Sequence, residues 1–187
     1  IERSIGIEIT VYIVLDERKF MYSVLFFNIF ISVLMLKICM VSSCGGHFME
    51  LLQLIPAVKD LDFYIVTERN VASKDLLKKY KHYCLIQQER RNISFPLKFS
   101  YNIVASLFFL LKERPDIIIS TGAGASYPTC RLGKWLGRKI IYIESFAKLN
   151  KASVTGKMIY PFADQFYVQW REMKKVYPNA IYCGTVY

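Results

Sequence analysis

The sequence predicts a Rossmann-like α/β fold, in which a doubly wound parallel sheet carries helices on both faces. Short apolar runs alternate with segments of helical periodicity from residue 36 to residue 187, without an internal repeat or a flexible linker. Several runs are apolar at consecutive positions, as expected of strands that are buried on both faces. At 187 residues the chain can hold one such domain, but it is too short for two nucleotide-binding domains of ~150 residues each.

The expected elements follow one another along the chain in strict alternation. The first strand, Leu36–Ser43, is followed by two adjacent glycines and then by a segment with apolar residues at helical spacing. The other expected strands are residues 63–67, 83–86, 116–120, 139–144 and 165–169, and the expected helices are residues 47–58, 73–80, 100–112, 131–136 and 155–161.

Residues 1–35 are expected to lie outside this domain. The stretch Phe20–Leu36 has no formal charge over seventeen residues, which is close to the lower limit for a membrane-spanning helix. Met35 stands directly before the first expected strand, so a start of translation there would make the upstream residues an extension of the gene model. The sequence leaves both interpretations open: a membrane anchor or an upstream extension.

The positive charge is confined to the expected domain. Residues 1–36 hold three basic and four acidic residues, so the remaining 22 basic and 11 acidic residues give residues 37–187 a net charge of +11. Such a charge attracts polyanions, anionic lipid headgroups or phosphate-bearing substrates. The chain has neither the aromatic pattern of RNA-binding proteins nor a zinc-ligand spacing, so we expect no nucleic-acid partner.

The five cysteines are widely spaced and include no C-x-x-C pair. This pattern is typical of reduced thiols in a cytosolic protein. Cys39 lies in an apolar run and is expected to fill the core. Cys44 stands beside two glycines, but without a placed base we expect a structural role for it.

Two glycine-rich turns follow expected strands, where parallel sheets collect their ligands. In the first, Ser43, Gly45 and Gly46 allow backbone N–H groups to approach an anion, although the turn matches neither G-x-G-x-x-G nor the Walker pattern. His47 at the start of the next helix could bind a phosphate, take a proton from a sugar hydroxyl, or only cap local structure. The second turn offers contacts to a polar ligand from Thr121, Gly122, Gly124 and Ser126.

Two further features are candidates for function. Glu144 ends a buried strand, so its carboxylate is expected either to orient or deprotonate a sugar hydroxyl, or to form an ion pair with one of the many basic residues. Arg90, Arg91 and Lys98 lead into a nearly all-apolar helical segment. This arrangement is typical of an interfacial membrane helix, and a partner interface or a buried outer-layer helix is the alternative.

Four separated motifs resemble those of one protein family. They are ICMVSSCGGHFMELLQL, RPDIIISTGAGASYPTCRLGKWLG, IIYIESFAKLNKASVTGKMIYPFADQFYVQW and YPNAIYCGT. In order and spacing they resemble the bacterial PssD-like proteins of exopolysaccharide and capsule synthesis. Those proteins are related to the membrane-associated subunit of the split N-acetylglucosaminyltransferase of eukaryotic asparagine-linked glycosylation. The resemblance spans residues 36–187, and this segment is also similar to the N-terminal half of MurG-type transferases. The stretch before Met35 does not share the resemblance.

The resemblance implies one half of a GT-B glycosyltransferase. In such a family this half holds the lipid-linked acceptor, and a separate small subunit carries most of the nucleotide-sugar site. The matching positions near the acceptor diphosphate and on the next two strand ends are Gly45, Gly46, His47, Thr121, Gly122, Gly124 and Glu144.

We therefore expect a subunit of an inverting, two-chain, UDP-sugar-dependent glycosyltransferase. It would extend an undecaprenyl-diphosphate-linked saccharide at the cytoplasmic face of the membrane, together with a donor-binding partner subunit. His47 or Glu144 would be the base, and the UDP-sugar would be a substrate, with no further cofactor and no metal ion. A non-catalytic membrane scaffold that recruits and activates the partner is the alternative.

Overall fold

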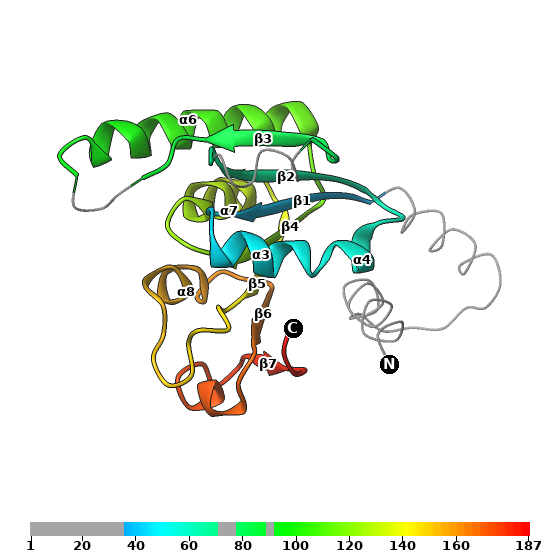
Figure 1. Cartoon of the computed structure of the whole chain (residues 1–187), viewed down its shortest axis with the longest axis vertical. Coiled ribbons are helices and arrows are strands. Elements are labelled where there is room, and N and C mark those ends of the chain that lie inside the picture. The colour runs from blue at the N-terminus through cyan, green and yellow to red at the C-terminus, as the bar shows by residue number, and fades with distance from the viewer. Residues whose placement is uncertain (1–35, 71–77, 89–91) are drawn as a thin grey trace.

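The computed structural model describes residues 36–70, 78–88 and 92–187, which form a seven-stranded sheet with helices on both faces (Figure 1). All strand pairs are parallel, and the strand order is β3-β2-β1-β4-β5-β6-β7. The predicted Rossmann-like fold is confirmed. The strands are β1 (Lys37–Ser42), β2 (Asp62–Glu68), β3 (His82–Leu85), β4 (Ile117–Gly122), β5 (Lys139–Ile143), β6 (Gln165–Val168) and β7 (Ile181–Tyr182).

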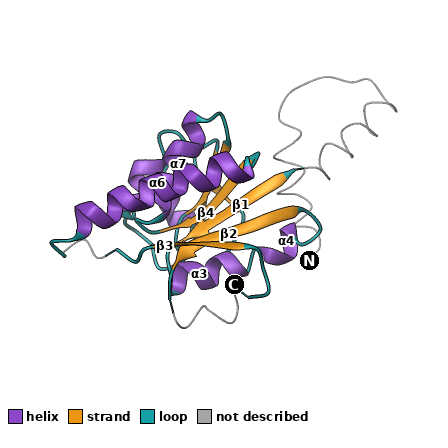
Figure 2. Cartoon of the chain, turned by 90° about the horizontal axis from the view of Figure 1, so that it is seen from above, coloured by secondary structure: helices purple, strands orange, loops and turns teal. Residues whose placement is uncertain are grey.

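Helices cover the two faces of the sheet separately. Figure 2 shows α3 (Gly46–Leu52) and α4 (Ile55–Val58) on one face, with α6 (Phe95–Glu113) and α7 (Ser126–Trp135) on the other. The chain continues through α8 (Val154–Ile159) and a 3-10 helix, η1 (Arg171–Lys175).

The strand β1 shows how the sheet makes two cores. Cys39 and Val41 belong to one apolar cluster, together with Leu110 of α6. Ile38 and Met40 belong to a second cluster, which contains Phe48 and Leu51 of α3. Because successive side chains of a strand point to opposite faces, a strand between two helix layers needs apolar residues at every position. This requirement explains the unbroken apolar runs in the sequence.

The structure departs from the predicted element boundaries at three helices. The predicted helix 47–58 is broken into α3 and α4, and Pro56 lies in the first turn of α4, where its missing N–H is not needed. The long helix α6 begins at Phe95 rather than at residue 100, because Pro96 again fits the first helical turn. Helix α7 begins at Ser126, five residues before the predicted start.

The order of the strands creates a switch point beside β1. The chain forms β1, β2 and β3 toward one edge and then returns to place β4 on the other side of β1. Ligands of open parallel sheets bind at such a point, outside the carboxyl ends of the strands. The carboxyl ends of β1 and β4 carry the two glycine-rich turns, so the fold brings these turns together.

Several sequence predictions fall on residues outside the described ranges. These are residues 20–35 of the uncharged stretch Phe20–Leu36, most of the predicted helix 73–80, and both Arg90 and Arg91. Within the described ranges, no helix is both long enough and apolar enough to cross a membrane.

None of the five cysteines takes part in a disulfide. Cys39 is fully buried in the sheet, as predicted, and burial raises its pKa to about 12. Burial has the same effect on Cys130, whose pKa is also about 12. Cys44 is only partly buried, and its thiol lies 3.5 Å from Glu68 Oε2. Cys44 therefore contributes to the structure of the first turn.

Candidate active site

The first glycine-rich turn leaves open space beside the start of α3. Gly45 has a φ of 77°, a conformation that residues with a side chain rarely adopt. A Cβ placed at Gly45 or Gly46 would meet nothing within 4 Å. Ser43 directs its hydroxyl to the carbonyl of Cys44, at 3.2 Å. The turn therefore has both the backbone shape and the room to receive a ligand.

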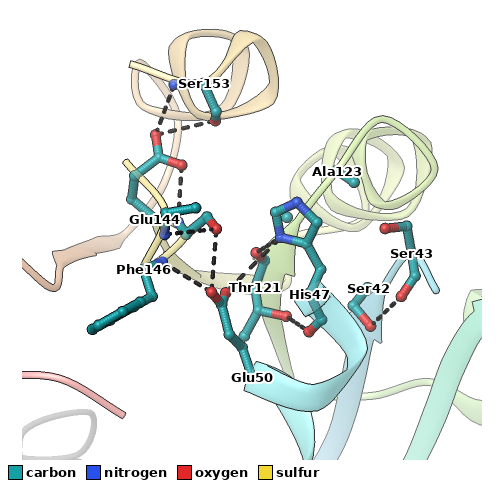
Figure 3. A network of polar contacts seen from close by, with 12 residues as sticks. Ser42, Ser43, His47, Glu50, Thr121, Ala123, Glu144, Phe146 and Ser153 are labelled. Carbon is teal, nitrogen blue, oxygen red and sulfur yellow. Dashed lines mark hydrogen bonds and ion pairs between the residues drawn. The ribbon is translucent and has the colours of Figure 1, made fainter. Parts of the chain in front are cut away.

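His47 connects this turn to the end of β4. Its Nδ1 lies 2.9 Å from the carbonyl oxygen of Thr121, and the Thr121 hydroxyl donates to the His47 carbonyl at 2.7 Å (Figure 3). Because a carbonyl can only accept, Nδ1 carries the hydrogen and the neutral ring has its lone pair on Nε2. The side chain is 30% exposed, so the ring is not sealed in the core.

In this geometry Nε2 of the neutral ring is left able to accept a proton, and the predicted role of His47 as a base stays a prediction. The alternative predicted from the sequence was a histidine that only caps local structure. The cap position of α3 is Gly45, and no side chain caps that helix end. The ring instead makes a contact to another strand, across 74 residues of sequence.

The second glycine-rich turn has a tightly constrained backbone. Gly122 has a φ of 107°, and a Cβ there would lie 2.8 Å from the Tyr142 hydroxyl and 3.4 Å from His47 Nδ1. Ala123 adopts a φ of 62°, in the left-handed region that costs a residue with a side chain about 1 kcal/mol. Residues with such a strained backbone often occur at functional sites, where surrounding contacts hold them in place. Ala123 is an example, because it follows Gly122, which lies close to His47.

The other two residues predicted on this turn have different surroundings. Gly124 lines a cavity, described below. Ser126 is fully buried at the start of α7, and its hydroxyl donates to the carbonyl of Ala123 at 2.8 Å. Ser126 therefore holds the turn in shape, and a contact between its hydroxyl and a ligand stays a prediction.

Glu144 is buried and fully hydrogen-bonded. Its Oε2 accepts from the Ser153 N–H at 3.2 Å, from the Ser153 hydroxyl at 3.1 Å and from the Tyr177 hydroxyl at 2.8 Å. Its Oε1 accepts from the Ser145 N–H at 3.0 Å. These contacts tie the end of β5 to α8 and to the C-terminal segment. None of these donors is basic, so they do not form the ion pair considered from the sequence, and the predicted role as a base remains untested.

Glu50, which the sequence analysis did not select, lies closer to His47. Its Oε1 accepts from the Phe146 N–H at 2.9 Å and from the Ser145 hydroxyl at 3.2 Å. Its Oε2 has no hydrogen-bond partner and lies 3.9 Å from His47 Nδ1 (Figure 3). Burial raises the pKa of this carboxyl group.

A signal for Glu50 was present in the sequence. Residues three positions apart lie on the same face of a helix, and Glu50 follows His47 by three. The apolar pattern of Phe48, Leu51 and Leu52 predicted the helix, but it did not indicate that the polar residues His47 and Glu50 interact.

A cavity of about 510 Å³ opens between the two turns and the start of α6. Its residues combine polar groups at the strand ends with aromatic and aliphatic groups from the helices. The rings of Phe95 and Phe99 are stacked, with centroids 5.6 Å apart. The lining residues are Ser43, Glu68, Gln88, Phe95, Phe99, Ala123, Gly124, Ala125, Tyr127, Val154, Thr155 and Met158.

Helix α6 buries polar residues beside Leu110 and exposes a stripe of apolar residues. The buried side includes Asn102 and Ser106, which bond to the backbone of Ile86 and to Thr129. The exposed side is an apolar stripe with four- and three-residue spacing, so its members share one helix face. The stripe consists of Leu97 (78% exposed), Tyr101 (55%), Val104 (68%), Phe108 (58%) and Leu111 (53%).

No three His, Cys, Asp or Glu side chains come together as metal ligands would, within the ranges that the structure describes. The chain does contain a D-x-D spacing at Asp60 and Asp62. This pair precedes and begins β2, at the amino end of the sheet, and Asp62 lies 3.5 Å from Lys37. The pair is therefore at the opposite end of the sheet from His47.

Comparisons with known proteins identify the family of the chain. The family model of the Alg14-like oligosaccharide biosynthesis proteins matches residues 38–186. The chain belongs to this family. Its relatives include the UDP-N-acetylglucosamine transferase subunit ALG14 of Mus musculus, with 26% identity over 180 residues, 81% of this chain and 83% of that protein. The corresponding subunit of Schizosaccharomyces pombe is 43% identical over 77 residues, 38% of this chain and 37% of that protein.

Solved structures show the same fold in one half of larger proteins. MurG of Acinetobacter baumannii aligns with a TM-score of 0.61 and 16% identity, over 73% of this chain and 42% of MurG. The UDP-N-acetylglucosamine 2-epimerase of Rickettsia bellii aligns with a TM-score of 0.63 and 13% identity, over 81% of this chain and 45% of the epimerase. The chain therefore spans less than half the length of either protein.

The predicted family is confirmed at its coarser level. The resemblance to the membrane-associated subunit of a split N-acetylglucosaminyltransferase agrees with the Alg14 match. The finer label of PssD-type capsule and exopolysaccharide synthesis receives no support from these relatives, whose names refer to a UDP-N-acetylglucosamine transferase.

Proposed function

We propose that this chain is the acceptor-side subunit of a two-chain glycosyltransferase. The enzyme transfers N-acetylglucosamine, or a related hexose, from a UDP-sugar to a saccharide linked to a lipid diphosphate. The observation that carries this proposal is the placement of His47, in an Alg14-family fold, with Nδ1 fixed by Thr121 at the switch point of the sheet. A UDP-sugar is the donor substrate, and the proposal requires no additional cofactor.

The proposed reaction is a single displacement at the sugar carbon. The acceptor hydroxyl gives its proton to His47 Nε2, and the hydroxyl oxygen forms a bond to C1 of the donor sugar. The bond between C1 and the diphosphate oxygen breaks, and UDP leaves with the electron pair. Attack from the side opposite the leaving group inverts the configuration at C1. Glu144, with both oxygens already hydrogen-bonded, supports the position of the neighbouring loops in this scheme.

The cavity has the composition that a lipid-linked diphosphate needs. Ser43 of the first turn and Ala123 and Gly124 of the second line it, and such small residues let a diphosphate approach the backbone. Its helix-derived residues, Phe95, Phe99 and Met158, supply apolar contacts for the first units of the lipid. His47 lies beside the same turns but does not line the cavity, so we propose that the saccharide extends from the cavity toward His47.

The apolar stripe of α6 supports contact with a membrane. An exposed apolar stripe of this length, on a helix that turns Asn102 and Ser106 inward, differs from an ordinary surface helix, whose apolar face packs on the core. Lys98 and Lys112 lie on the same helix, where they can contact anionic headgroups. Phe95 and Phe99, in the first turns of the same helix, line the cavity. We propose that a lipid-linked acceptor enters from the bilayer beside this end of α6. The proposed location is the cytoplasmic face of the membrane.

A partner subunit has to supply the donor half of the enzyme. Transfer needs donor and acceptor within reacting distance in a closed cleft, and one Rossmann-like domain provides one wall of that cleft. The chain covers 42% of MurG. We propose that the partner docks near the chain end, where Tyr182 is 37% exposed and Tyr187 is 62% exposed. Tyr177, near the same end of the chain, is buried and donates a hydrogen bond to Glu144, so it is not available for docking.

Reconstitution tests the proposal. The purified chain alone, incubated with UDP-N-acetylglucosamine and lipid-diphosphate-linked acceptors, should show negligible transfer. Addition of a separate donor-binding subunit should restore it. Undecaprenyl-linked and dolichyl-linked acceptors in parallel reactions test the bacterial carrier predicted from the sequence. Robust turnover by the chain alone would contradict the two-chain proposal, and loss of complex formation on deletion of residues 181–187 would support the docking surface.

A non-catalytic scaffold is the second candidate function. It is favoured by the exposed apolar stripe and the exposed chain end, which provide a membrane surface and a docking surface without any chemistry. Substitution of His47 in the reconstituted complex separates the two, because a scaffold would tolerate it.

A further inference from the structure

We infer that Glu50 is a positioning residue for the proposed base, and that its carboxylate stabilises the positive charge that His47 acquires when it takes the proton. This inference rests on the proposed function of His47. It concerns a residue that touches neither the acceptor nor the donor, and that acts only through the histidine ring.

The carboxylate of Glu50 is held at one oxygen and left open at the other. Oε1 receives two hydrogen bonds, from the Phe146 N–H at 2.9 Å and from the Ser145 hydroxyl at 3.2 Å. The Phe146 carbonyl is itself fixed by the Trp170 indole N–H, at 2.6 Å. The loop after β5 therefore sets the orientation of the carboxylate, and this orientation turns Oε2 toward the ring of His47.

An open carboxylate oxygen inside a protein is unfavourable unless a charge approaches it. Only 5% of the Glu50 side chain is exposed, and Oε2 has no hydrogen-bond partner. Removing a carboxylate oxygen from water without a partner destabilises the folded state. Glu144, by contrast, has hydrogen bonds to both carboxylate oxygens. The open oxygen of Glu50 therefore indicates an interaction that forms during the reaction.

Among the charged groups that act on Glu50, His47 is the one that can carry a positive charge. Glu144 lies after β5 and acts on Glu50 as a like charge. Tyr187, at the end of the described chain, also interacts electrostatically with Glu50. His47, on the same helix as Glu50, is the opposite charge when it is protonated. The carboxylate thus acts mainly on the state of the histidine that follows proton transfer.

The sequence of events follows from the two distances at Nδ1. In the neutral ring, Nδ1–H donates to the Thr121 carbonyl at 2.9 Å, and Glu50 Oε2 stands 3.9 Å away. When Nε2 takes the acceptor proton, the ring becomes a cation, and the nearby carboxylate lowers its energy without accepting a proton itself. This arrangement favours the transition state more than the ground state, because the charge exists only after the proton begins to move.

The decisive variant is Glu50→Gln, which removes the charge but keeps an oxygen that can accept from Phe146. In the reconstituted complex we expect the maximal rate to fall about 10- to 100-fold, while the KM for the UDP-sugar stays within about twofold. We also expect the nuclear magnetic resonance titration of His47 in the chain itself to move to lower pH, because a nearby negative charge is removed. The titration needs neither partner nor substrate.

The chain offers matched controls for this experiment. His82 is the second of the two histidines, and it lies at the start of β3, at the opposite end of the sheet. Its titration should be the same in wild type and in Glu50→Gln. Asp62→Asn removes a carboxylate that is 61% exposed at the amino end of β2, and it should leave both the His47 titration and the rate unchanged.

The two readouts separate failure of this inference from failure of the proposed function. An unchanged His47 titration in Glu50→Gln would overturn the inference, whatever the activity. A shifted titration with an unchanged rate would also overturn the catalytic part of it. If His47→Gln leaves turnover intact, the base role of His47 fails, and the role of Glu50 fails with it. If Glu50→Gln does not fold, Glu50→Asp retains the charge farther from the ring, and the inference then requires a smaller titration shift in the same direction.

Discussion

The two ends of the sheet each hold a buried glutamate, and the two are treated in opposite ways. At the amino end, Glu113 closes α6 and contacts Lys37 Nζ at 2.6 Å, Lys81 Nζ at 2.7 Å and the Tyr83 hydroxyl. At the carboxyl end, Glu50 of α3 has one oxygen without a hydrogen-bond partner. One carboxylate is surrounded by donors, and the other is left partly unsatisfied.

The pKa values of the two groups move apart accordingly. Burial pushes the pKa of Glu113 upward, but hydrogen bonds from Lys37, Lys81 and Tyr83 outweigh it and lower the pKa from 4.5 to about 2. For Glu50, burial outweighs the hydrogen bond from Phe146, and its pKa is raised. Glu113 at the amino end is thus paired in a way that stabilises the fold, whereas Glu50 at the carboxyl end keeps one oxygen with which a reaction can interact.

The largest expected effect is at the carboxyl end. His47→Gln should lower the turnover of the reconstituted complex by about 10²- to 10⁴-fold, because no other group at this position accepts the proton. The free energy of unfolding should change little, since glutamine can still donate to the Thr121 carbonyl. Steady-state kinetics and urea denaturation measure the two quantities, with His82→Gln as the matched control. Unchanged turnover would instead favour the scaffold.

At the amino end, the expected effect is on stability. Glu113→Gln leaves two lysines beside a neutral side chain, and we expect the free energy of unfolding to fall by about 2 kcal/mol. This value is below that of a fully buried pair, because the side chain of Lys81 is 51% exposed. Urea denaturation measures the change. Glu172→Gln, at an exposed position of η1, is the control and should have no measurable effect.

A loss of activity per folded molecule in Glu113→Gln would contradict a purely stabilising role for Glu113, because it would give the amino end of the sheet a part in function.

The same variant predicts a pH dependence. Because the pKa of Glu113 is lower in the folded chain than its ordinary value of 4.5, its contribution to stability is present above pH 4.5. The contribution is lost as the pH falls toward about 2, where the carboxyl group becomes protonated in the folded chain. Wild type and Glu113→Gln should therefore differ in unfolding free energy at neutral pH and converge in acid. A difference that stays constant down to the lowest pH would contradict the ion-pair interpretation.

Helix α6 joins the two ends, so its stripe allows a test within one element. Replacing Leu97 and Tyr101 with serine, or Phe108 and Leu111 with serine, should weaken binding to anionic vesicles about 10-fold in each case. The unfolding free energy should change by less than about 0.5 kcal/mol, because these side chains are exposed. Vesicle sedimentation measures the binding.

The first pair should also reduce transfer to the lipid-linked acceptor, because Leu97 and Tyr101 lie on the turns of α6 that carry the cavity residues Phe95 and Phe99. The second pair lies near the amino end of the sheet and serves as the control for this effect. Equal losses of transfer in both variants would argue against entry of the lipid beside Phe95 and Phe99.

The smallest expected effect is the stability of Glu50→Gln. Because the pKa of Glu50 is raised in the folded chain, its ionisation disfavours the folded state once the pH rises above the ordinary value of 4.5. At neutral pH the variant should be as stable as wild type, or more stable by up to about 1 kcal/mol. Below pH 4.5 the two should be equal. A loss of stability similar to that of Glu113→Gln would show that Glu50 is a structural residue, and would remove the contrast between the two ends.

The sequence by itself was sufficient for the parts of this protein that depend on local pattern. Apolar runs such as Ile38–Val41 are buried on both faces of the sheet, so every position is apolar and the run can be recognised as a strand from the sequence. The two glycine-rich turns were predicted at the ends of β1 and β4, because positive φ values at Gly45 and Gly122 are allowed to glycine at little cost. His47 was a candidate for the same reason: it directly follows such a turn.

Only the tertiary structure decided the parts that depend on residues distant in sequence. Glu50 meets Phe146 across 96 positions, and Glu144 meets Tyr177 across 33, so no local pattern could show that the first is left open and the second is saturated. The composition of α6 predicted an apolar helix but not which side faces solvent. Asn102 and Ser106 form hydrogen bonds to Ile86 and Thr129, and these contacts turn the apolar stripe outward. Hydrogen bonding and burial are properties of assembled neighbours, and those neighbours come together only when the chain folds.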